Sequence, residues 1–257
     1  MIIEHKGIQV YYTEQGYGEP IILLHGFLEN STMWKEITPN LSKTHRVISI
    51  DLLGHGKTGC LGYIHSMELM AETVEAVLDY LNIKKSIFIG HSMGGYVALA
   101  FAEKKPQALN GICLINSTFL PDDKERQALR TRASNMAKTN FKSLVSMSFT
   151  NLFSPESKTR YQNQLKLALN EALKTPVQGY IAASEGMKIR KDRTDLFKSL
   201  SCNKLFVLGQ KDPIMNVVLL KELLEDSDVE IVELSEGHMS YIENLTELTY
   251  KLVRFIE

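Results

Sequence analysis

The sequence of 257 residues has few cysteines, a single tryptophan and no excess of either charge. Lys and Arg total 29 and Asp and Glu total 30, which gives a formal net charge of −1. Proteins that bind nucleic acid or anionic membranes through their overall charge carry a positive excess, so we expect neither partner. Cys60, Cys113 and Cys202 are too few and too scattered for a disulfide framework or a zinc site. They predict reduced thiols in a cytoplasmic protein without a bound metal.

Long apolar runs are also missing from the sequence. No stretch approaches the ~18 apolar residues of a membrane-spanning helix. Residues 1–10 include Glu4, His5 and Lys6 and do not resemble a secretory signal peptide. These absences predict a soluble globular chain, whose length suits one large domain or two small ones.

Short apolar runs recur along the chain and are typical of strands buried on both faces of a parallel sheet. Helical patterns separate several of them, most clearly over residues 67–81, where apolar residues recur at helical spacing. This alternation predicts an α/β fold with a mostly parallel sheet between two layers of helices. The expected strands are residues 2–5, 8–13, 21–24, 47–50, 87–89, 111–115, 205–208 and 229–234.

One stretch, from residue 117 to about residue 197, contains only helical patterns. Pro121, Pro155 and Pro176 lie near the expected helix starts, where proline is tolerated. We interpret residues 117–197 as an insertion into one core that residues 1–116 and 198–257 form together. Apolar side chains of the insertion either pack it against the core or line a substrate pocket. The pocket candidates, with one more residue near the carboxyl end, are Met136, Met147, Phe149, Phe153, Tyr180, Met187 and Met239.

A candidate nucleophile lies between an expected strand and an expected helix. Residues 90–94 read Gly-His-Ser-Met-Gly, which matches the G-x-S-x-G pattern of a nucleophile elbow. The pattern alone also fits a tightly packed glycine turn, but its place at a strand-to-helix junction favours a reactive Ser92. Gly90 and Gly94 on either side of the serine would relieve backbone clashes in so sharp a turn.

A serine nucleophile needs a base, and the base needs a carboxylate partner. His238 directly follows the last expected strand, and Asp212 follows the strand before it. Ligands and catalytic groups gather at such strand ends in parallel sheets. Asn116, at another strand end, cannot supply a negative charge, and Asp51 fits a turn better. We therefore predict a catalytic triad of Ser92, Asp212 and His238.

An oxyanion intermediate needs two preorganised donors. We expect them to be the backbone N–H groups of Met93, directly after the serine, and of Phe27, in the loop after an early strand. Gly26 would let that loop approach the site, and His25 would orient it through a hydrogen bond. His91 is expected to support the site by packing or by a hydrogen bond.

These residues together resemble the serine branch of the α/β-hydrolase superfamily. The family pattern H-G-x is met by residues 25–27, D-x-x-G-x-G-x-S/T by residues 51–58, and the elbow by residues 90–95. Asp212 and His238 match the acid and base loops. The resemblance implies an α/β-hydrolase fold with a mostly parallel eight-stranded sheet and a helical lid inserted after the sixth strand. It implies no metal or organic cofactor.

The leading functional hypothesis is a serine esterase that cleaves a carboxylic ester of a small or medium acyl substrate through an acyl-enzyme. A second hypothesis keeps the triad for carbon–carbon bond hydrolysis or a menaquinone-pathway type of elimination on a carboxylated substrate. A third is a small-ligand receptor with little turnover. The second hypothesis needs basic groups in the insertion, and the candidates are Arg126, Arg130, Arg132, Arg160, Arg190 and Arg193.

Overall fold

The computed structural model describes residues 1–257 and contains one eight-stranded sheet in the order β1-β2-β4-β3-β5-β6-β7-β8. The pairs β1–β2 and β2–β4 are antiparallel, and all other neighbours are parallel. Every expected strand is present, most of them slightly longer than the apolar run that predicted it, so the predicted fold class is confirmed. The strands are β1 (Ile2–His5), β2 (Ile8–Gln15), β3 (Glu19–Leu24), β4 (His45–Ile50), β5 (Ser86–His91), β6 (Leu109–Ile115), β7 (Asn203–Gly209) and β8 (Glu230–Leu234).

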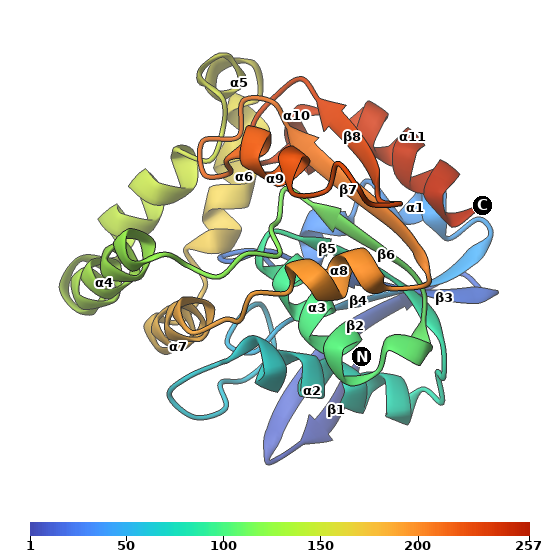
Figure 1. Ribbon diagram of the computed structural model, residues 1–257. Helices are drawn as coiled ribbons and strands as arrows, with labels where there is room; N and C mark the ends of the chain where they lie inside the picture. Colours follow the sequence, from blue (N-terminus) through green and yellow to red (C-terminus); the bar gives the residue numbers. More distant parts are fainter.

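Helices cover both faces of the sheet (Figure 1). Successive residues of a strand point to opposite faces, and in β3 both sets are apolar. Ile22 and Leu24 pack in one core with α2 and α3, whereas Ile21 and Leu23 pack in the other with α1 and α11. The bounds are η1 (Ser31–Trp34), α1 (Thr38–Leu41), α2 (Met67–Tyr80), α3 (Met93–Lys104), η2 (Pro106–Ala108), α9 (Val217–Glu222), α10 (Ser240–Glu243) and α11 (Leu245–Ile256).

The helix predicted over residues 67–81 is α2. Ser66 begins it, because its side-chain oxygen accepts a hydrogen bond of 3.1 Å from the backbone N–H of Leu69. Met70, Val74 and Val77 lie one turn apart on the buried face. The apolar residues that recur at helical spacing in the sequence therefore form the face of α2 that packs into the larger core.

Between β6 and β7 the chain forms helices only: α4 (Lys124–Thr150), α5 (Pro155–Arg160), α6 (Gln162–Ala172), α7 (Val177–Lys188) and α8 (Thr194–Ser199). Pro155 opens α5 and Pro176 caps α7. Helices α4 to α7 gather on the side of the molecule toward which the arrowheads of β6 and β7 point (Figure 1). None of the chain's helices combines the length and the hydropathy that a membrane crossing requires.

A buried ion pair ties the two ends of this helical segment together. The Asp122 carboxylate, before α4, bonds to Nη1 of Arg190, after α7, at 2.6 Å. Arg190 Nε also donates to the carbonyl of Leu120 at 2.9 Å, and its guanidinium lies over the Tyr96 ring of α3. The helices α4 to α7 therefore leave and rejoin the sheet at a single fixed point above α3.

Candidate active site

The turn at Ser92 is strained and sharply bent. Ser92 has φ 49° and ψ −116°, a conformation that L-residues rarely adopt, between the end of β5 and the start of α3. A Cβ atom at Gly90 would lie 2.5 Å from the Gly94 backbone, and one at Gly94 would lie 2.6 Å from the carbonyl carbon of Leu24. Both glycines are therefore required by the close approach of backbone to backbone.

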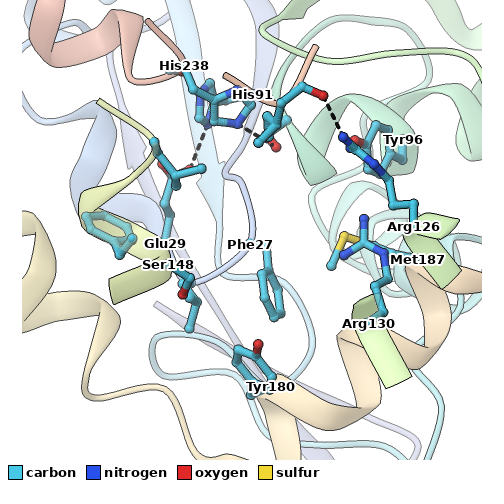
Figure 2. Close-up of a pocket in the computed structure, with 15 residues that line it drawn as sticks. Phe27, Glu29, His91, Tyr96, Arg126, Arg130, Ser148, Tyr180, Met187 and His238 are labelled. Carbon is cyan, nitrogen blue, oxygen red and sulfur yellow. Dashed lines mark hydrogen bonds and ion pairs between the residues drawn. The ribbon is translucent and has the colours of Figure 1, made fainter. Parts of the chain in front are cut away.

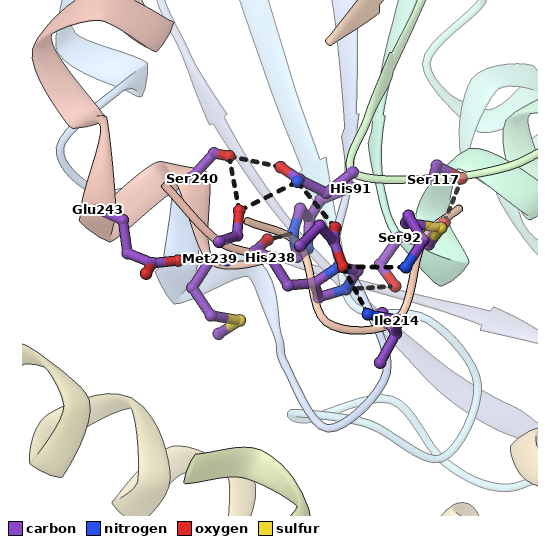
Figure 3. Close-up of polar contacts among 12 residues, drawn as sticks. His91, Ser92, Ser117, Ile214, His238, Met239, Ser240 and Glu243 are labelled. Atoms are coloured by element: carbon purple, nitrogen blue, oxygen red, sulfur yellow. Dashed lines mark hydrogen bonds and ion pairs between the residues drawn. The ribbon is translucent and has the colours of Figure 1, made fainter. Parts of the chain in front are cut away.

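Ser92, His238 and Asp212 form a continuous chain of hydrogen bonds. Figure 3 shows Ser92 and His238 among their polar contacts. Ser92 Oγ lies 3.0 Å from His238 Nε2, and His238 Nδ1 lies 2.7 Å from Asp212 Oδ2. The three residues follow β5, β7 and β8, whose carboxyl ends lie at one edge of the sheet. All three are buried, with Ser92 8% exposed. This geometry allows His238 Nε2 to accept the serine proton while the carboxylate holds the ring.

The Asp212 carboxylate is held by four hydrogen bonds. Besides His238, Oδ2 accepts from Asn116 Nδ2 at 3.0 Å, and Oδ1 accepts from the backbone N–H groups of Ile214 and Met215 at 2.9 and 3.2 Å. Burial alone would raise the pKa of Asp212, but the charge and N–H of His238 and the other donors outweigh it, and the pKa lies below its ordinary value. The carboxylate is therefore ionised at neutral pH.

Asn116 supports the site in a way that the sequence did not reveal. Its side chain donates to Asp212 and to the carbonyl of Gly237, at 3.2 Å, and accepts from Ser240 Oγ at 2.5 Å. One amide thus joins the end of β6 to the acid loop and the base loop. The sequence prediction considered Asn116 only as a replacement for the acid.

The two predicted oxyanion donors are free of other partners. The backbone N–H groups of Phe27 and Met93 donate to no acceptor in the protein, while those of Ser92 and Gly95 are used at 2.9 and 3.0 Å. Met93 is the first residue of α3, and the first N–H groups of a helix are unpaired by its geometry. Both donors belong to segments that flank Ser92 and are available to a negatively charged oxygen.

His25 orients the loop that carries Phe27, as predicted. Its Nε2 accepts from the backbone N–H of Leu52 at 2.8 Å, so its Nδ1 carries the proton and donates to the carbonyl of Gly26 at 2.7 Å. Burial lowers the pKa of His25 and keeps the ring neutral. Asp51 forms the predicted turn, in which Oδ2 accepts from the backbone N–H of Lys57 at 2.8 Å.

A buried pair of Glu29 and His91 joins three loops of the site. Glu29 Oε2 accepts from the Gly26 backbone N–H at 2.6 Å and lies 2.8 Å from His91 Nδ1, while His91 Nε2 donates to the His238 carbonyl at 2.9 Å. Burial opposes both charges, but their attraction outweighs it, so the pKa of Glu29 is lowered and that of His91 is raised. Figure 2 shows the pair beside His238. His91 has its predicted supporting place, whereas Glu29 was missed.

A cavity of about 130 Å³ opens over Ser92 (Figure 2). One wall consists of Arg126, Arg130 and Tyr96, and Glu29 lies on the opposite wall. The insertion helices supply about half of the lining. The complete lining is Phe27, Leu28, Glu29, His91, Ser92, Tyr96, Arg126, Arg130, Ser148, Phe149, Leu152, Tyr180, Met187, Ile214 and His238. No group of three or more His, Cys, Asp or Glu side chains is arranged to hold a metal ion.

The predicted pocket residues divide into three groups. Phe149, Tyr180 and Met187 line the cavity. The prediction was wrong for Met136 and Met147, which are 46% and 59% exposed because α4 turns other residues inward, such as Ser148 and Phe149, and these methionines to solvent. It was also wrong for Phe153 and Met239, which are fully buried in the core on the α11 face of the sheet and do not reach the cavity.

The six arginines of the insertion also fall into three groups. Arg190 and Arg193 are buried and form ion pairs. The partner of Arg190 is Asp122, and the partners of Arg193 are Glu68 and Glu103. Arg132 and Arg160 are exposed. Only Arg126 and Arg130 line the cavity.

Comparison with known proteins agrees with the fold described above. Residues 19–245 match the alpha/beta hydrolase fold family. The structure superposes with a TM-score of 0.91 on a thermophilic esterase from Thermogutta terrifontis, solved with malate bound, at 28% identity over 99% of this chain and 96% of the esterase. The 3-oxoadipate enol-lactonase 1 of Acinetobacter baylyi is 26% identical over 82% of this chain and 78% of its own length.

The dihydrolipoyllysine-residue acetyltransferase component of the acetoin cleaving system of Pseudomonas putida is 30% identical over 93% of this chain. This chain spans only 64% of that protein and 32% of the next curated relatives. The family match, in contrast, includes most of the sheet and all of the inserted helices. The chain therefore belongs to the alpha/beta hydrolase family.

Proposed function

We propose that the protein is a serine hydrolase that cleaves a small carboxylic ester or lactone through an acyl-enzyme. The single observation that carries this proposal is the hydrogen-bond chain from Ser92 through His238 to Asp212, which ends in the cavity. The similar proteins include an esterase and an enol-lactonase, whose reactions both open a carboxylic ester bond.

The first half of the reaction forms the acyl-enzyme. His238 Nε2 takes the proton of Ser92 as Oγ bonds to the substrate carbonyl carbon. The backbone N–H groups of Phe27 and Met93 stabilise the negative oxygen. His238 then protonates the departing alkoxide oxygen as its bond to carbon breaks, while Asp212 balances the charge of the imidazolium.

The second half releases the acid. His238 takes a proton from water, whose oxygen bonds to the acyl carbon, and returns that proton to Ser92 as the bond to Oγ breaks. Ester and water thus give acid and alcohol, and a lactone gives one hydroxy acid. Every proton in both halves moves through His238.

We assign the helices between β6 and β7 the role of a lid over the core of residues 1–116 and 198–257. The segment that they form, with the turn between α4 and α5, supplies Arg126, Arg130, Ser148, Phe149, Leu152, Tyr180 and Met187 to the cavity wall. The Asp122–Arg190 pair anchors both ends of this lid above α3. The cavity is small compared with ligand pockets of roughly 300–1,000 Å³, which favours a short acyl group.

Replacing the nucleophile tests the proposal. We expect Ser92→Ala to reduce turnover of p-nitrophenyl acetate by on the order of 10⁴-fold or more, because the remaining groups cannot form the acyl-enzyme. Ser143→Ala, at an exposed serine of α4, is the matched control and should retain wild-type rates. Wild-type turnover by folded Ser92→Ala would exclude the serine mechanism.

A further inference from the structure

The charges around the cavity leave one cation without an acidic partner. Glu29 on one wall is balanced by His91 at 2.8 Å. On the other wall, Arg130 bonds to Asp122, a carboxylate that also pairs with Arg190. Arg126 forms no ion pair, although every other charged group of the lining does. The cavity therefore has an uncompensated positive charge on its lid wall.

The guanidinium of Arg126 is fixed in place relative to Ser92. Its Nη2 donates to the carbonyl of Ile214 at 2.7 Å, and the N–H of the same Ile214 donates to Asp212 at 2.9 Å. Arg126 is thus two hydrogen bonds away from the carboxylate that orients His238. Figure 2 shows it beside Tyr96 on the cavity wall. A guanidinium has five N–H donors, and only one bond from this one to the protein is present.

We propose that the substrate is a short ester or lactone with a free carboxylate, and that Arg126 binds this carboxylate. The inference rests on the proposed function and specifies its substrate class. A planar guanidinium matches a carboxylate in two parallel hydrogen bonds. A partly buried arginine that forms no ion pair within the protein gains more from such an anion than from a neutral group, because it has already lost part of its water.

The carboxylate would have a second effect on the reaction. Held on the lid wall, it fixes the other end of a short acyl chain, so that the ester carbonyl is presented to Ser92 in one orientation. A small cavity and one fixed cation allow only a few carbons between the carboxylate and the reacting carbonyl. Succinate and glutarate monoesters are therefore the probes of choice.

The first experiment compares charged and neutral esters. Wild-type kcat/KM for monomethyl succinate or monomethyl glutarate should exceed that for the dimethyl ester. Arg126→Gln should lower this charged-to-neutral ratio roughly 10- to 100-fold, mainly through KM, as expected for one lost charge-assisted contact. Arg126→Lys should restore part of the ratio, and Arg132→Gln, at an exposed arginine of the same helix, should leave it unchanged. A ratio unaffected by Arg126→Gln, or no preference for either charged ester, would overturn the inference.

The second experiment separates this inference from the proposed function. Calorimetry with Ser92→Ala and monomethyl succinate measures binding without chemistry, and adding Arg126→Gln should raise Kd by a similar factor. If dimethyl esters are hydrolysed but the Kd for the monoester does not change, the inference alone fails. If Kd rises as expected but Ser92→Ala still turns over the ester, the serine mechanism fails and the binding site stands.

Discussion

At the scale of single residues, two buried imidazole–carboxylate pairs lie side by side. His238 with Asp212 forms the proposed proton pathway. His91 with Glu29 connects the loop of Gly26 and Phe27 to the backbone of His238. The two imidazole rings are 5.2 Å apart. In the proposed reaction the first pair carries the serine proton, whereas the second holds Gly26 and the base loop in position.

Removing the Glu29 charge should weaken this connection. We expect Glu29→Gln to lower the free energy of unfolding by about 1–3 kcal/mol near pH 6, and not more, because His91 can lose its proton instead of remaining an unpaired charge. The exposed Glu36→Gln is the control.

The pH dependence of that difference has a definite sign. The raised pKa of His91 gives stability that is complete below the unfolded value of 6.5 and is lost as pH rises through the folded value. The lowered pKa of Glu29 gives stability that is complete above 4.5 and is lost as pH falls through the folded value. Chemical denaturation should therefore find the largest difference between wild type and Glu29→Gln within this window. A difference that grows as pH rises above it would contradict an ionised pair.

At the scale of elements, the junction of β5 and α3 determines where the chemistry can occur. The strand ends at His91, the helix begins at Met93, and Ser92 alone makes the turn. The first turn of α3 lies against the end of β3, since the space above Gly94 is filled by the Leu24 carbonyl group. This contact holds the free N–H of Met93 close to the loop that carries Phe27.

Gly94→Ala should damage this junction. Alanine normally stabilises a helix by about 1 kcal/mol over glycine, but here its Cβ would meet backbone atoms of β3 that cannot move aside. We expect a loss of about 3 kcal/mol in unfolding free energy and a lower kcat. Gly62→Ala, where a Cβ meets open space at φ +75°, should cost only about 1–2 kcal/mol. Unchanged or increased stability of Gly94→Ala would refute the packing described for α3.

At the scale of the whole molecule, the parallel sheet brings together residues that are far apart in the sequence. Ser92 and His238 are 146 positions apart, and helices α4 to α8 lie between them in the chain. Their contact follows from the order β5-β6-β7-β8, which places the carboxyl ends of these strands in one row. Strand-end positions were therefore predictable from the sequence, because apolar runs mark the strands and the reactive residues follow them directly.

Residues whose roles depend on packing between elements were less predictable. Glu29 bonds to a histidine 62 positions away, and little in its local sequence distinguishes it from a solvated loop acid. Its one available signal is its place shortly after Gly26 in a loop with few other charges. Met136 and Met147 were mispredicted because apolar character does not tell which side of a long helix faces the core. The α4 helix also bends at Asn140, which shifts the phase of its two halves.

Covalent labelling of Ser92 tests the central claim most directly. A fluorophosphonate reacts only with an activated serine, so intact-mass and peptide analysis should find one adduct, on the peptide that contains Ser92. The Ser92→Ala variant should take up no label, and the Ser143→Ala control should be labelled like the wild type. Folded wild-type protein that stays unlabelled, or carries the adduct at another serine, would contradict the assignment of Ser92 as the nucleophile.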